Sequence, residues 1–210
     1  VIAERMTKDP RFPLISATGS CRMGKIVGKV VAERLGRSLL ELGGNNAVIV
    51  DKDADQKLAA AAVVFAGVGT AGQRCTTTRR LIAHEKIADA LLAKLVKAYS
   101  SVRIGDPAAE GTLVGPRVNA RAVEGFTAAV AAAKRQGGTV LVGGEKHTQS
   151  GLTGHFVQPT IIRAPANNVL PIASEETFAP ILYVFTYRDA EEAIAMQNPV
   201  AQGLSSAIFT

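Results

Sequence analysis

A lone thiol lies in the segment GTAGQRCTTTRR, which runs from Gly69 to Arg80 and contains Cys75. A buried structural cysteine is usually a small apolar filler among Leu, Val and Ala, whereas Cys75 lies between Arg74 and a run of threonines. A thiol becomes a nucleophile when its thiolate is stabilised and accessible, which turn amides and a neighbouring arginine can arrange. We therefore predict an exposed nucleophile at Cys75; the alternative is a loop cysteine without a chemical role.

A carboxylate, Glu41, lies in the segment LLELGGNNAV. It is placed between Leu40 and Leu42 and is followed by the glycine pair Gly43 and Gly44. A carboxylate buried among leucines is costly unless it is partnered or functional, and desolvation raises the pKa of such a group towards that of a general base. We predict that Glu41 is buried and acts as a base; the alternative places it on the solvent side of an edge strand.

A turn of small residues in the segment SATGSCRMGK separates an expected strand from an expected helix. The free N–H groups and positive dipole end of a helix N-terminus attract phosphate, and Gly19 lets the backbone come close to such a ligand. This pattern predicts a phosphate-binding turn, whereas the alternative is ordinary helix capping by Ser20 or its neighbours. We interpret Cys21 as a small residue at the start of the helix.

Strands that could position these residues alternate with helices along the chain. Short apolar runs bounded by Gly, Pro, Asn and Ser predict the strands, and those at 39–42 and 47–50 are expected to be buried. The alternation indicates an α/β sheet with crossover helices. The expected strands cover residues 14–17, 39–42, 47–50, 77–83, 139–142, 156–162, 180–187 and 204–210.

Helices are expected between these strands. The first opens after Ser20 and stops near Gly36. Asp53 is expected to cap the next helix, with Gln56 three residues later completing a capping box, and this helix runs to residue 67. Further helices are expected at residues 85–100 and 119–136, and Asp189 is expected to cap a short one.

The composition excludes several classes of protein. The 210 residues, 47% hydrophobic and 20% charged, are typical of a globular protein with one large or two small domains. No apolar run approaches the roughly 20 residues that span a bilayer. The net charge of +6 comes from scattered Lys and Arg with only 5% aromatic residues, so we expect no nucleic-acid partner. The two cysteines, without a secretory signal, predict a reduced, cytoplasmic location.

Several segments together resemble the aldehyde dehydrogenase family. LELGG is similar to the family's block around its glutamate, GQRCT to the block around its catalytic cysteine, and TGSCRMG to its coenzyme turn. EETFAPIL, at residues 175–182, is similar to a second coenzyme-contacting strand, and QPTII and QGLSSAIFT fit further blocks in the right order. The resemblance covers essentially the whole chain. ELGGNNA and GQRCTTTRRL are similar to the antiquitin branch, whereas most other branches have Lys-Ser or Lys-Asn in place of Asn45-Asn46.

This resemblance implies an α/β fold in which a catalytic domain with a mostly parallel sheet follows the last part of a Rossmann-like coenzyme domain. Residues 1–43 would end the coenzyme domain, and residues 44–210 would form a catalytic domain that is incomplete at its C-terminus. We accordingly expect a central fragment of a longer enzyme. The family's upstream coenzyme-binding blocks and its downstream intersubunit segment would lie outside this sequence.

The resemblance also implies a reaction. Cys75 attacks an aldehyde to give a thiohemiacetal, hydride passes to the nicotinamide ring, and Glu41 activates the water that hydrolyses the resulting thioester. The implied coenzyme is NAD, with NADP as the alternative. The implied substrate is a carboxylate-bearing aldehyde such as α-aminoadipic semialdehyde, which the antiquitin branch oxidises.

Roles for single residues follow from the same resemblance. The backbone N–H of Cys75 would form half of an oxyanion hole. Arg74 would bind the distant carboxylate of the substrate, because the planar guanidinium group pairs well with a carboxylate. Thr76 would also contact the substrate. The alternative for Arg74 is a salt bridge within the loop. We expect no metal, and a homo-oligomer in the full-length form. The expected coenzyme contacts are Thr18, Gly19, Ser20, Leu42, Gly43, Glu176, which would hold the nicotinamide ribose, and Phe178 beside it.

Other functions stay open at this point. Cys75 and Glu41 could serve a thiol hydrolase or acyltransferase, but no histidine lies in the blocks that would support one. The chain could also be a catalytically incompetent fragment or an assembly module of the same fold. CoA-acylating relatives are a closer alternative, although they generally lack the water-activating glutamate.

Overall fold

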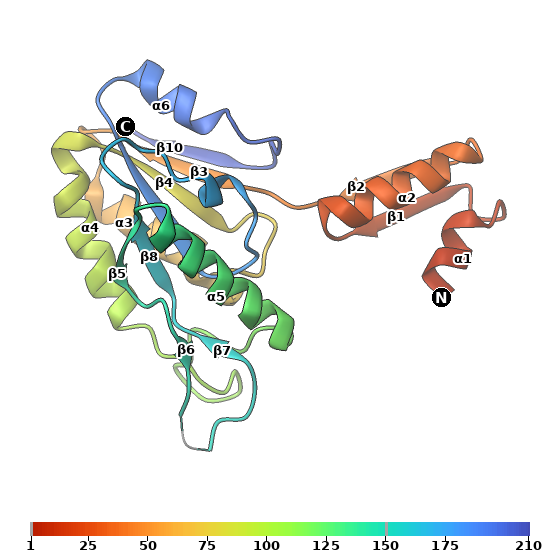
Figure 1. Ribbon diagram of the computed structural model, residues 1–210, viewed down its shortest axis with the longest axis horizontal. Coiled ribbons are helices and arrows are strands. Elements are labelled where there is room, and N and C mark those ends of the chain that lie inside the picture. Colours follow the sequence, from red (N-terminus) through yellow and green to blue (C-terminus); the bar gives the residue numbers. More distant parts are fainter. Residues whose placement is uncertain (1, 150) are drawn as a thin grey trace. The chain divides into compact units, whose positions relative to one another are not determined.

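The computed structural model describes residues 2–149 and 151–210. The chain divides into two compact units, residues 1–43 and residues 44–210 (Figure 1). The assignment of the first unit to a coenzyme domain and of the second to a catalytic domain stays a prediction. No helix in the described ranges is long and apolar enough to cross a membrane.

The first unit is a strand–helix–strand motif preceded by a short helix. Helix α1 (Ile2–Lys8) leads to β1 (Leu14–Thr18), α2 (Cys21–Glu33) and β2 (Arg37–Glu41). Strands β1 and β2 are parallel, in register from Leu14 opposite Arg37 to Thr18 opposite Glu41. Parallel strands need a crossover connection, and α2 provides it. The predicted strand and helix of this region are therefore present.

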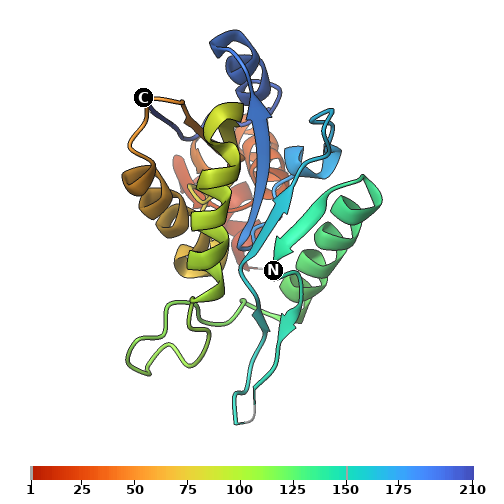
Figure 2. The same cartoon turned by 90° about the vertical axis from the view of Figure 1, so that its left-hand side faces the viewer.

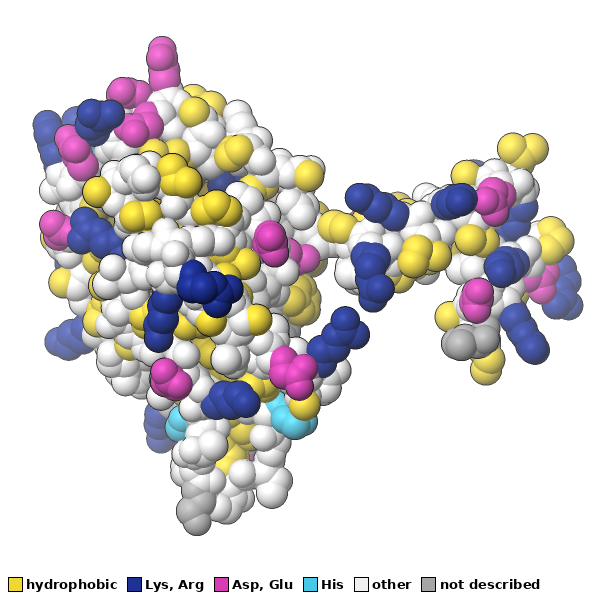
Figure 3. All heavy atoms as spheres, in the orientation of Figure 1, with side chains coloured by type: hydrophobic (Ala, Val, Ile, Leu, Met, Phe, Trp, Pro, Cys, Tyr) yellow, Lys and Arg dark blue, Asp and Glu magenta, His cyan; other side chains and the backbone are white. Residues whose placement is uncertain are grey.

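The two-stranded sheet of the first unit buries little of its apolar surface. Leu39 on β2 is 56% exposed, and Glu41 at the end of the strand is exposed as well. The prediction that β2 is a buried strand is therefore wrong for this chain, because α2 covers only one face of the pair. Figure 3 shows hydrophobic side chains on the surface of this unit, and the exposed large ones are Ile2, Met6, Phe12, Leu14, Ile26, Leu35 and Leu39.

The second unit is built on a six-stranded sheet with the strand order β10-β3-β4-β9-β8-β5. All neighbouring pairs are parallel except β5 with β8, so the predicted α/β fold with a mostly parallel sheet is confirmed. A separate antiparallel pair joins β6 (Lys146–His147) to β7 (Phe156–Val157). The six strands are β3 (Asn46–Val50), β4 (Thr78–His84), β5 (Thr139–Val142), β8 (Thr160–Arg163), β9 (Ile181–Tyr187) and β10 (Ser206–Phe209).

Helices cover both faces of this sheet (Figures 1 and 2). Helices α3 (Gln56–Val68) and α4 (Glu85–Ser100) pack on one face, where Leu91 and Leu95 are fully buried. Helices α5 (Ala120–Arg135) and α6 (Ala190–Gln197) pack on the other around Phe126. Because β4 and β9 are buried between the two helix layers, residues at their ends are held in fixed positions.

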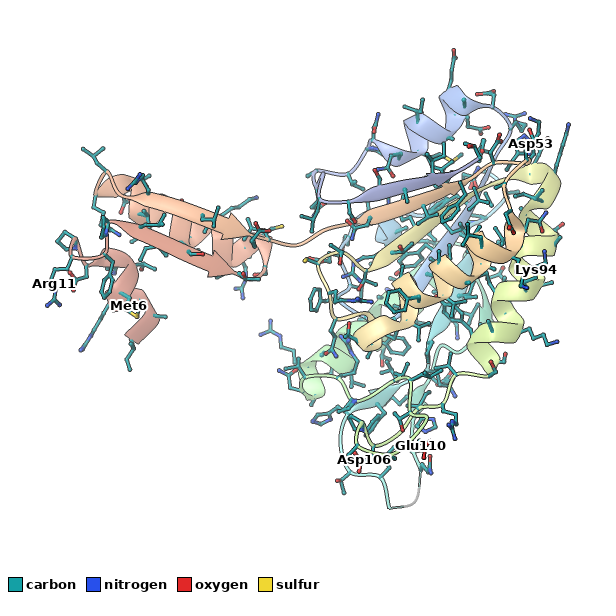
Figure 4. All side chains as sticks on the ribbon, turned by 180° about the vertical axis from the view of Figure 1, so that it is seen from behind. Met6, Arg11, Asp53, Lys94, Asp106 and Glu110 are labelled. Carbon is teal, nitrogen blue, oxygen red and sulfur yellow. The ribbon has the colours of Figure 1, made fainter. Side chains whose placement is uncertain are left out.

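Two local predictions are corrected by the structure. The cap of α3 is Asp55, whose Oδ1 accepts hydrogen bonds from the backbone N–H of Lys57 at 2.8 Å and of Leu58 at 3.1 Å. Asp53 instead forms an ion pair with Lys52 and lies in the loop that precedes the helix (Figure 4). The single strand expected at 156–162 is split into β7 and β8 at Pro159, which lacks the N–H that a continuous ladder requires.

Candidate active site

Cys75 lies on the loop between α3 and β4, at the amino end of β4. We call residues 69–77 the nucleophile loop; it begins with the 3-10 turn η1 (Gly69–Gly72). Thr70 and Ala71 adopt left-handed backbone conformations, with φ of 52° and 53°. Such conformations cost an L-residue roughly 1–2 kcal/mol each. The loop therefore depends on contacts that hold it in this shape.

Gly72 is the position at which this loop approaches the segment before β9. Its φ is +69°, and a Cβ at this position would lie 2.2 Å from the backbone carbon of Ala179. Only glycine satisfies both conditions. The next residue, Gln73, ties the loop to a second segment, because its Nε2 donates to the carbonyl of Pro116 at 3.2 Å and its Oε1 accepts from the N–H of Val118 at 2.9 Å.

Cys75 is a free, partly exposed cysteine. Asn46 on β3 fixes the backbone around it: the Nδ2 group donates to the carbonyl of Cys75 at 2.7 Å and to that of Thr77 at 2.9 Å. The Oδ1 atom of Asn46 accepts from the N–H of Ser205 at 3.2 Å. One buried amide thus binds the nucleophile loop to the neighbouring strands.

Arg74 and Thr76 flank the cysteine. The Arg74 guanidinium lies over the ring of Phe65, with 5.3 Å from Cζ to the ring centroid, and its buried Nε has no hydrogen-bond partner among the described residues. Within residues 2–149 and 151–210 no ion pair engages Arg74, so the loop salt bridge considered as its alternative does not occur there. Thr76 is exposed beside the thiol.

Arg79, a buried arginine of β4, was not predicted from the sequence to belong to the site. Its Nε donates to the carbonyl of Gly44 at 3.2 Å, and its NH2 group donates to the carbonyl of Arg74 at 3.1 Å and to Oε1 of Glu176 at 3.2 Å. Burial lowers the pKa of Arg79, while the carboxylate of Glu176 and, more weakly, the nearby Cys75 oppose this shift. An arginine stays charged at neutral pH even so. Arg79 therefore links the nucleophile loop to Glu176.

A second buried arginine that was missed, Arg117, supports the same loop from the other side. Its NH1 donates to the carbonyl of Ala71 at 2.8 Å, and its NH2 donates to the carbonyl of Phe178. Burial, together with the like charge of Arg79, lowers the pKa of Arg117 to about 10. Its hydrogen bond to Ala71 helps to offset the backbone strain of the loop.

Arg80 and Asn45 form a separate hydrogen-bond network. The guanidinium donates to Oδ1 of Asn45 at 3.1 Å and to the carbonyl of Met196 at 2.7 Å, and the Asn45 amide donates to the carbonyl of Ala173 at 2.9 Å. None of these acceptors belongs to the nucleophile loop. Asn46 and Arg79 therefore support the nucleophile loop. Their sequence neighbours Asn45 and Arg80 instead stabilise the surrounding fold.

Glu176 and Phe178 lie at the edge of a cavity of about 640 Å³. Oε1 of Glu176 accepts from both the N–H of Gly44, at 3.0 Å, and Arg79, whereas no hydrogen bond within the described residues engages Oε2. Phe178 is 42% exposed. A carboxylate with one uncommitted oxygen beside an exposed ring suits a ligand that carries hydroxyl groups. The opposite wall is a small-residue face of α5 formed by Ala122, Gly125, Ala128, Ala129 and Ala132.

The remaining predicted residues lie in the first unit, at the carboxyl ends of β1 and β2. Thr18 is opposite Glu41 in the strand pair, and the N–H of Gly19 donates to the carbonyl of Glu41 at 2.9 Å. Ser20 caps α2, its Oγ accepting from the N–H of Met23 at 3.1 Å, which is the capping role considered as the alternative. Its phosphate-binding role stays a prediction.

Glu41 requires a correction. It was expected to be buried among leucines, but its side chain is exposed in this chain, because β2 forms the edge of a two-stranded sheet. The turn around Ser20 and the start of the Leu42-Gly43 segment lie together with Glu41 at one end of this unit, while Cys75, Arg74, Glu176 and Phe178 lie together in the second unit. No three His, Cys, Asp or Glu side chains gather as a metal site in the described parts of the chain.

The fold and site define a class of α/β protein that presents a cysteine on a strained loop at the amino end of a central strand. The pattern of the aldehyde dehydrogenase family matches residues 1–210, so the chain belongs to the aldehyde dehydrogenase family. The resemblance stated from the sequence is thereby confirmed.

Curated relatives match the full length of the chain. It is 51% identical over 209 residues to aldehyde dehydrogenase family 7 member A1 of Malus domestica and 50% identical over 209 residues to alpha-aminoadipic semialdehyde dehydrogenase of Mus musculus. The alignments cover 100% of this chain and 40% and 38% of those relatives. The chain therefore spans about 40% of the length of the curated relatives it matches.

Solved structures of the family superimpose closely on the chain. Betaine aldehyde dehydrogenase from Staphylococcus aureus, in complex with NAD+, matches with a TM-score of 0.94 and 29% identity over 100% of this chain and 41% of that one. HpcC from Thermus thermophilus matches with a TM-score of 0.93 and 34% identity over 99% of this chain and 41% of that one.

Proposed function

We propose that this chain carries the catalytic cysteine of an NAD-dependent dehydrogenase that oxidises a carboxylate-bearing aldehyde to the acid. The observation that carries the proposal is the partly exposed Cys75 on a loop whose flanking carbonyls are bound by Asn46 and Arg79. Family membership supports the reaction class. The alpha-aminoadipic semialdehyde dehydrogenases among the relatives support the substrate class.

In the proposed reaction the Cys75 thiolate attacks the aldehyde carbon and forms a C–S bond, and the carbonyl oxygen becomes an oxyanion. The backbone N–H of Cys75 donates a hydrogen bond to that oxygen. Bound NAD would supply the acceptor for the hydride that leaves this carbon, and the adduct on Cys75 would thereby become a thioester. Glu41 then removes a proton from the water that attacks the thioester, so that the acid leaves and the thiolate returns. General-base assistance of this kind is worth roughly 10²–10⁴ in rate.

Several residues would hold the coenzyme. Glu176, with its uncommitted Oε2, would bind ribose hydroxyls beside Phe178. Thr18, Gly19 and Ser20 would approach the phosphates at the start of α2. Leu42 and Gly43 would contact the nicotinamide end, and NADP remains the alternative coenzyme. The NAD+ complexes of the superimposable structures support this assignment.

The substrate carboxylate would be bound by Arg74, next to the exposed Thr76. Its guanidinium has an unpartnered Nε and no ion pair within the described residues, so its charge is available for a ligand. A bidentate pair with a carboxylate would satisfy that charge. We further propose a cytoplasmic location and, for the full-length protein, a homo-oligomer.

The test is NADH formation by the longest natural protein that contains these 210 residues. We expect turnover of α-aminoadipic semialdehyde and a loss of at least about 10³-fold in kcat for Cys75→Ala, because no other group replaces the nucleophile. Cys21→Ser is the matched control and should keep its rate. Equal turnover by Cys75→Ala and the parent protein would refute the proposal.

A further inference from the structure

The peptide group between Arg74 and Cys75 is held from its carbonyl side. The Arg74 carbonyl accepts from the NH2 group of Arg79 at 3.1 Å and from the N–H of Thr77 at 3.1 Å. The following carbonyl, that of Cys75, accepts from Asn46 at 2.7 Å. Two successive peptide groups at the nucleophile are therefore fixed by side chains that come from the buried sheet.

Fixing a carbonyl also fixes the N–H on the other side of the same peptide. The peptide unit is planar and trans, so its N–H points away from its C=O. The direction of the Cys75 N–H is therefore set by the atoms that bind the Arg74 carbonyl. No described residue accepts a hydrogen bond from the Cys75 N–H, so this donor is free for a ligand.

We propose that Arg79 is a positioning residue that aims the backbone N–H of Cys75 at the oxyanion formed when the thiolate adds to a carbonyl group. The inference rests on the proposed function and assigns Arg79 a role within that site. Arg79 acts through the Arg74 carbonyl and does not itself contact the substrate.

The geometry of Arg79 explains why an arginine occupies a buried position. Burying a charge is costly unless it is paired and hydrogen-bonded. The Arg79 guanidinium donates to Glu176 and to four backbone carbonyls. These belong to Gly44, Arg74, Ala179 at 3.4 Å and Gly72 at 3.5 Å. A lysine cannot span acceptors in these directions with one ammonium group. The same side chain thus joins the loop to the carboxylate at the coenzyme cavity.

Two reactions of Cys75 distinguish an effect on the direction of its N–H from an effect on the reactivity of its sulfur. With p-nitrophenyl acetate, the thiolate attacks the carbonyl carbon, an oxyanion forms, and p-nitrophenolate leaves as the C–S bond is retained. With iodoacetamide, the thiolate displaces iodide at a saturated carbon, and no oxyanion forms. Neither reaction needs a coenzyme. Both can be followed on the 210-residue chain in a Cys21→Ser background, so that only Cys75 reacts.

The variants are Arg79→Gln and Arg79→Lys, with Arg80→Gln as the matched control. Arg80 is the neighbouring buried arginine, and its hydrogen bonds go to Asn45, Met196 and Gln197 rather than to the nucleophile loop. Loss of an oxyanion donor costs about 10²–10³ in rate. We expect Arg79→Gln to lower the acylation rate about tenfold to a hundredfold while the alkylation rate changes less than about threefold.

The ratio of acylation to alkylation decides between the outcomes. Arg79→Lys should lower this ratio as well, because lysine keeps the positive charge but lacks the several donors of the guanidinium group. If Arg79→Gln fails to fold, the ratio is taken from Arg79→Lys. Arg80→Gln should change both rates by the same factor. An unchanged ratio in the folded Arg79 variants overturns the positioning role and leaves the proposed function standing. Absence of any acylation of the parent Cys75 overturns the proposed function, and the inference fails with it.

Discussion

Asn46 donates a hydrogen bond of 2.7 Å from its Nδ2 group to the backbone carbonyl of Cys75, across 29 residues of sequence. The same amide also binds Thr77 and Ser205, so one side chain joins the nucleophile loop to β3 and to the segment before β10. Gly44, two residues earlier, has no room for a side chain because a Cβ there would lie 2.4 Å from the same carbonyl oxygen. Gly44 and Asn46, which follow Glu41 in the sequence, thus lie against the backbone of Cys75.

Asn46→Ala should destabilise the protein by about 2 kcal/mol. The change leaves the buried carbonyl of Thr77, the part-buried carbonyl of Cys75 and the N–H of the exposed Ser205 without their partner. A buried group left unpaired costs about 1–3 kcal/mol, and water can bind the more exposed groups. Asn198→Ala, at an exposed position, is the control and should change the free energy of unfolding by less than about 0.5 kcal/mol. Urea denaturation measures both values, and equal stability of the two variants would contradict the role of Asn46.

Two glycine substitutions should change stability in opposite directions. Gly72→Ala places a Cβ 2.2 Å from the Ala179 backbone at a φ of +69°, so it should destabilise by more than about 2 kcal/mol. Gly125→Ala adds a methyl group in α5 where no atom lies within 4 Å, so it should stabilise by about 0.5–1 kcal/mol. Thermal melting shows the sign directly; a more stable Gly72→Ala would mean that the loop does not adopt this conformation.

The elements with strong periodicity could be predicted from sequence. Residues 85–100 form α4 as expected, because the apolar positions repeat at helical spacing. Asp53 was wrongly predicted as the cap of α3 in place of Asp55, because acids at both positions could cap the helix and only the loop geometry selects one. The exposure of β2 could not be predicted either, since burial depends on what covers a strand and a local apolar run does not report that.

Only some residues of the candidate site could be predicted from the sequence. Cys75 and Arg74 could be predicted because their unusual neighbours are adjacent in the chain. The buried arginines were missed because their partners are distant: Arg79 meets Glu176 97 residues later and Arg117 meets Phe178 61 residues later, mostly through carbonyl groups that every residue carries. One signal was present: Arg79 and Arg80 are adjacent charged residues inside a run expected to be a strand, so at least one of them faces a layer in which its charge needs a partner.

Asp55 should make stability depend on pH. Hydrogen bonds from the N–H groups of Leu58 and Lys57 lower its pKa. A carboxyl group with a depressed pKa in the folded state contributes stability above its unfolded pKa of about 3.9 and loses it as the pH falls through the folded value. Asp55→Ala should therefore destabilise more at pH 7 than at about pH 3, in denaturation curves recorded at both values. Asp53→Ala, which removes no cap, should show a smaller difference; a larger one would restore Asp53 as the cap.

Arg74 should determine the preference for a substrate carboxylate. Arg74→Ala removes the guanidinium that lies over Phe65 but none of the contacts that hold the Cys75 carbonyl, so the nucleophile should remain in place. A hydrogen bond to a charged group contributes about 1.5–3 kcal/mol, which corresponds to a loss of about tenfold to a hundredfold in kcat/KM for a semialdehyde with a carboxylate. An uncharged aldehyde of the same length should be oxidised at nearly the parental rate, and its initial rates of NADH formation serve as the control. An equal loss of kcat/KM for both aldehydes would mean that Arg74 maintains the shape of the loop. Unchanged kcat/KM for both would mean that Arg74 does not bind the substrate.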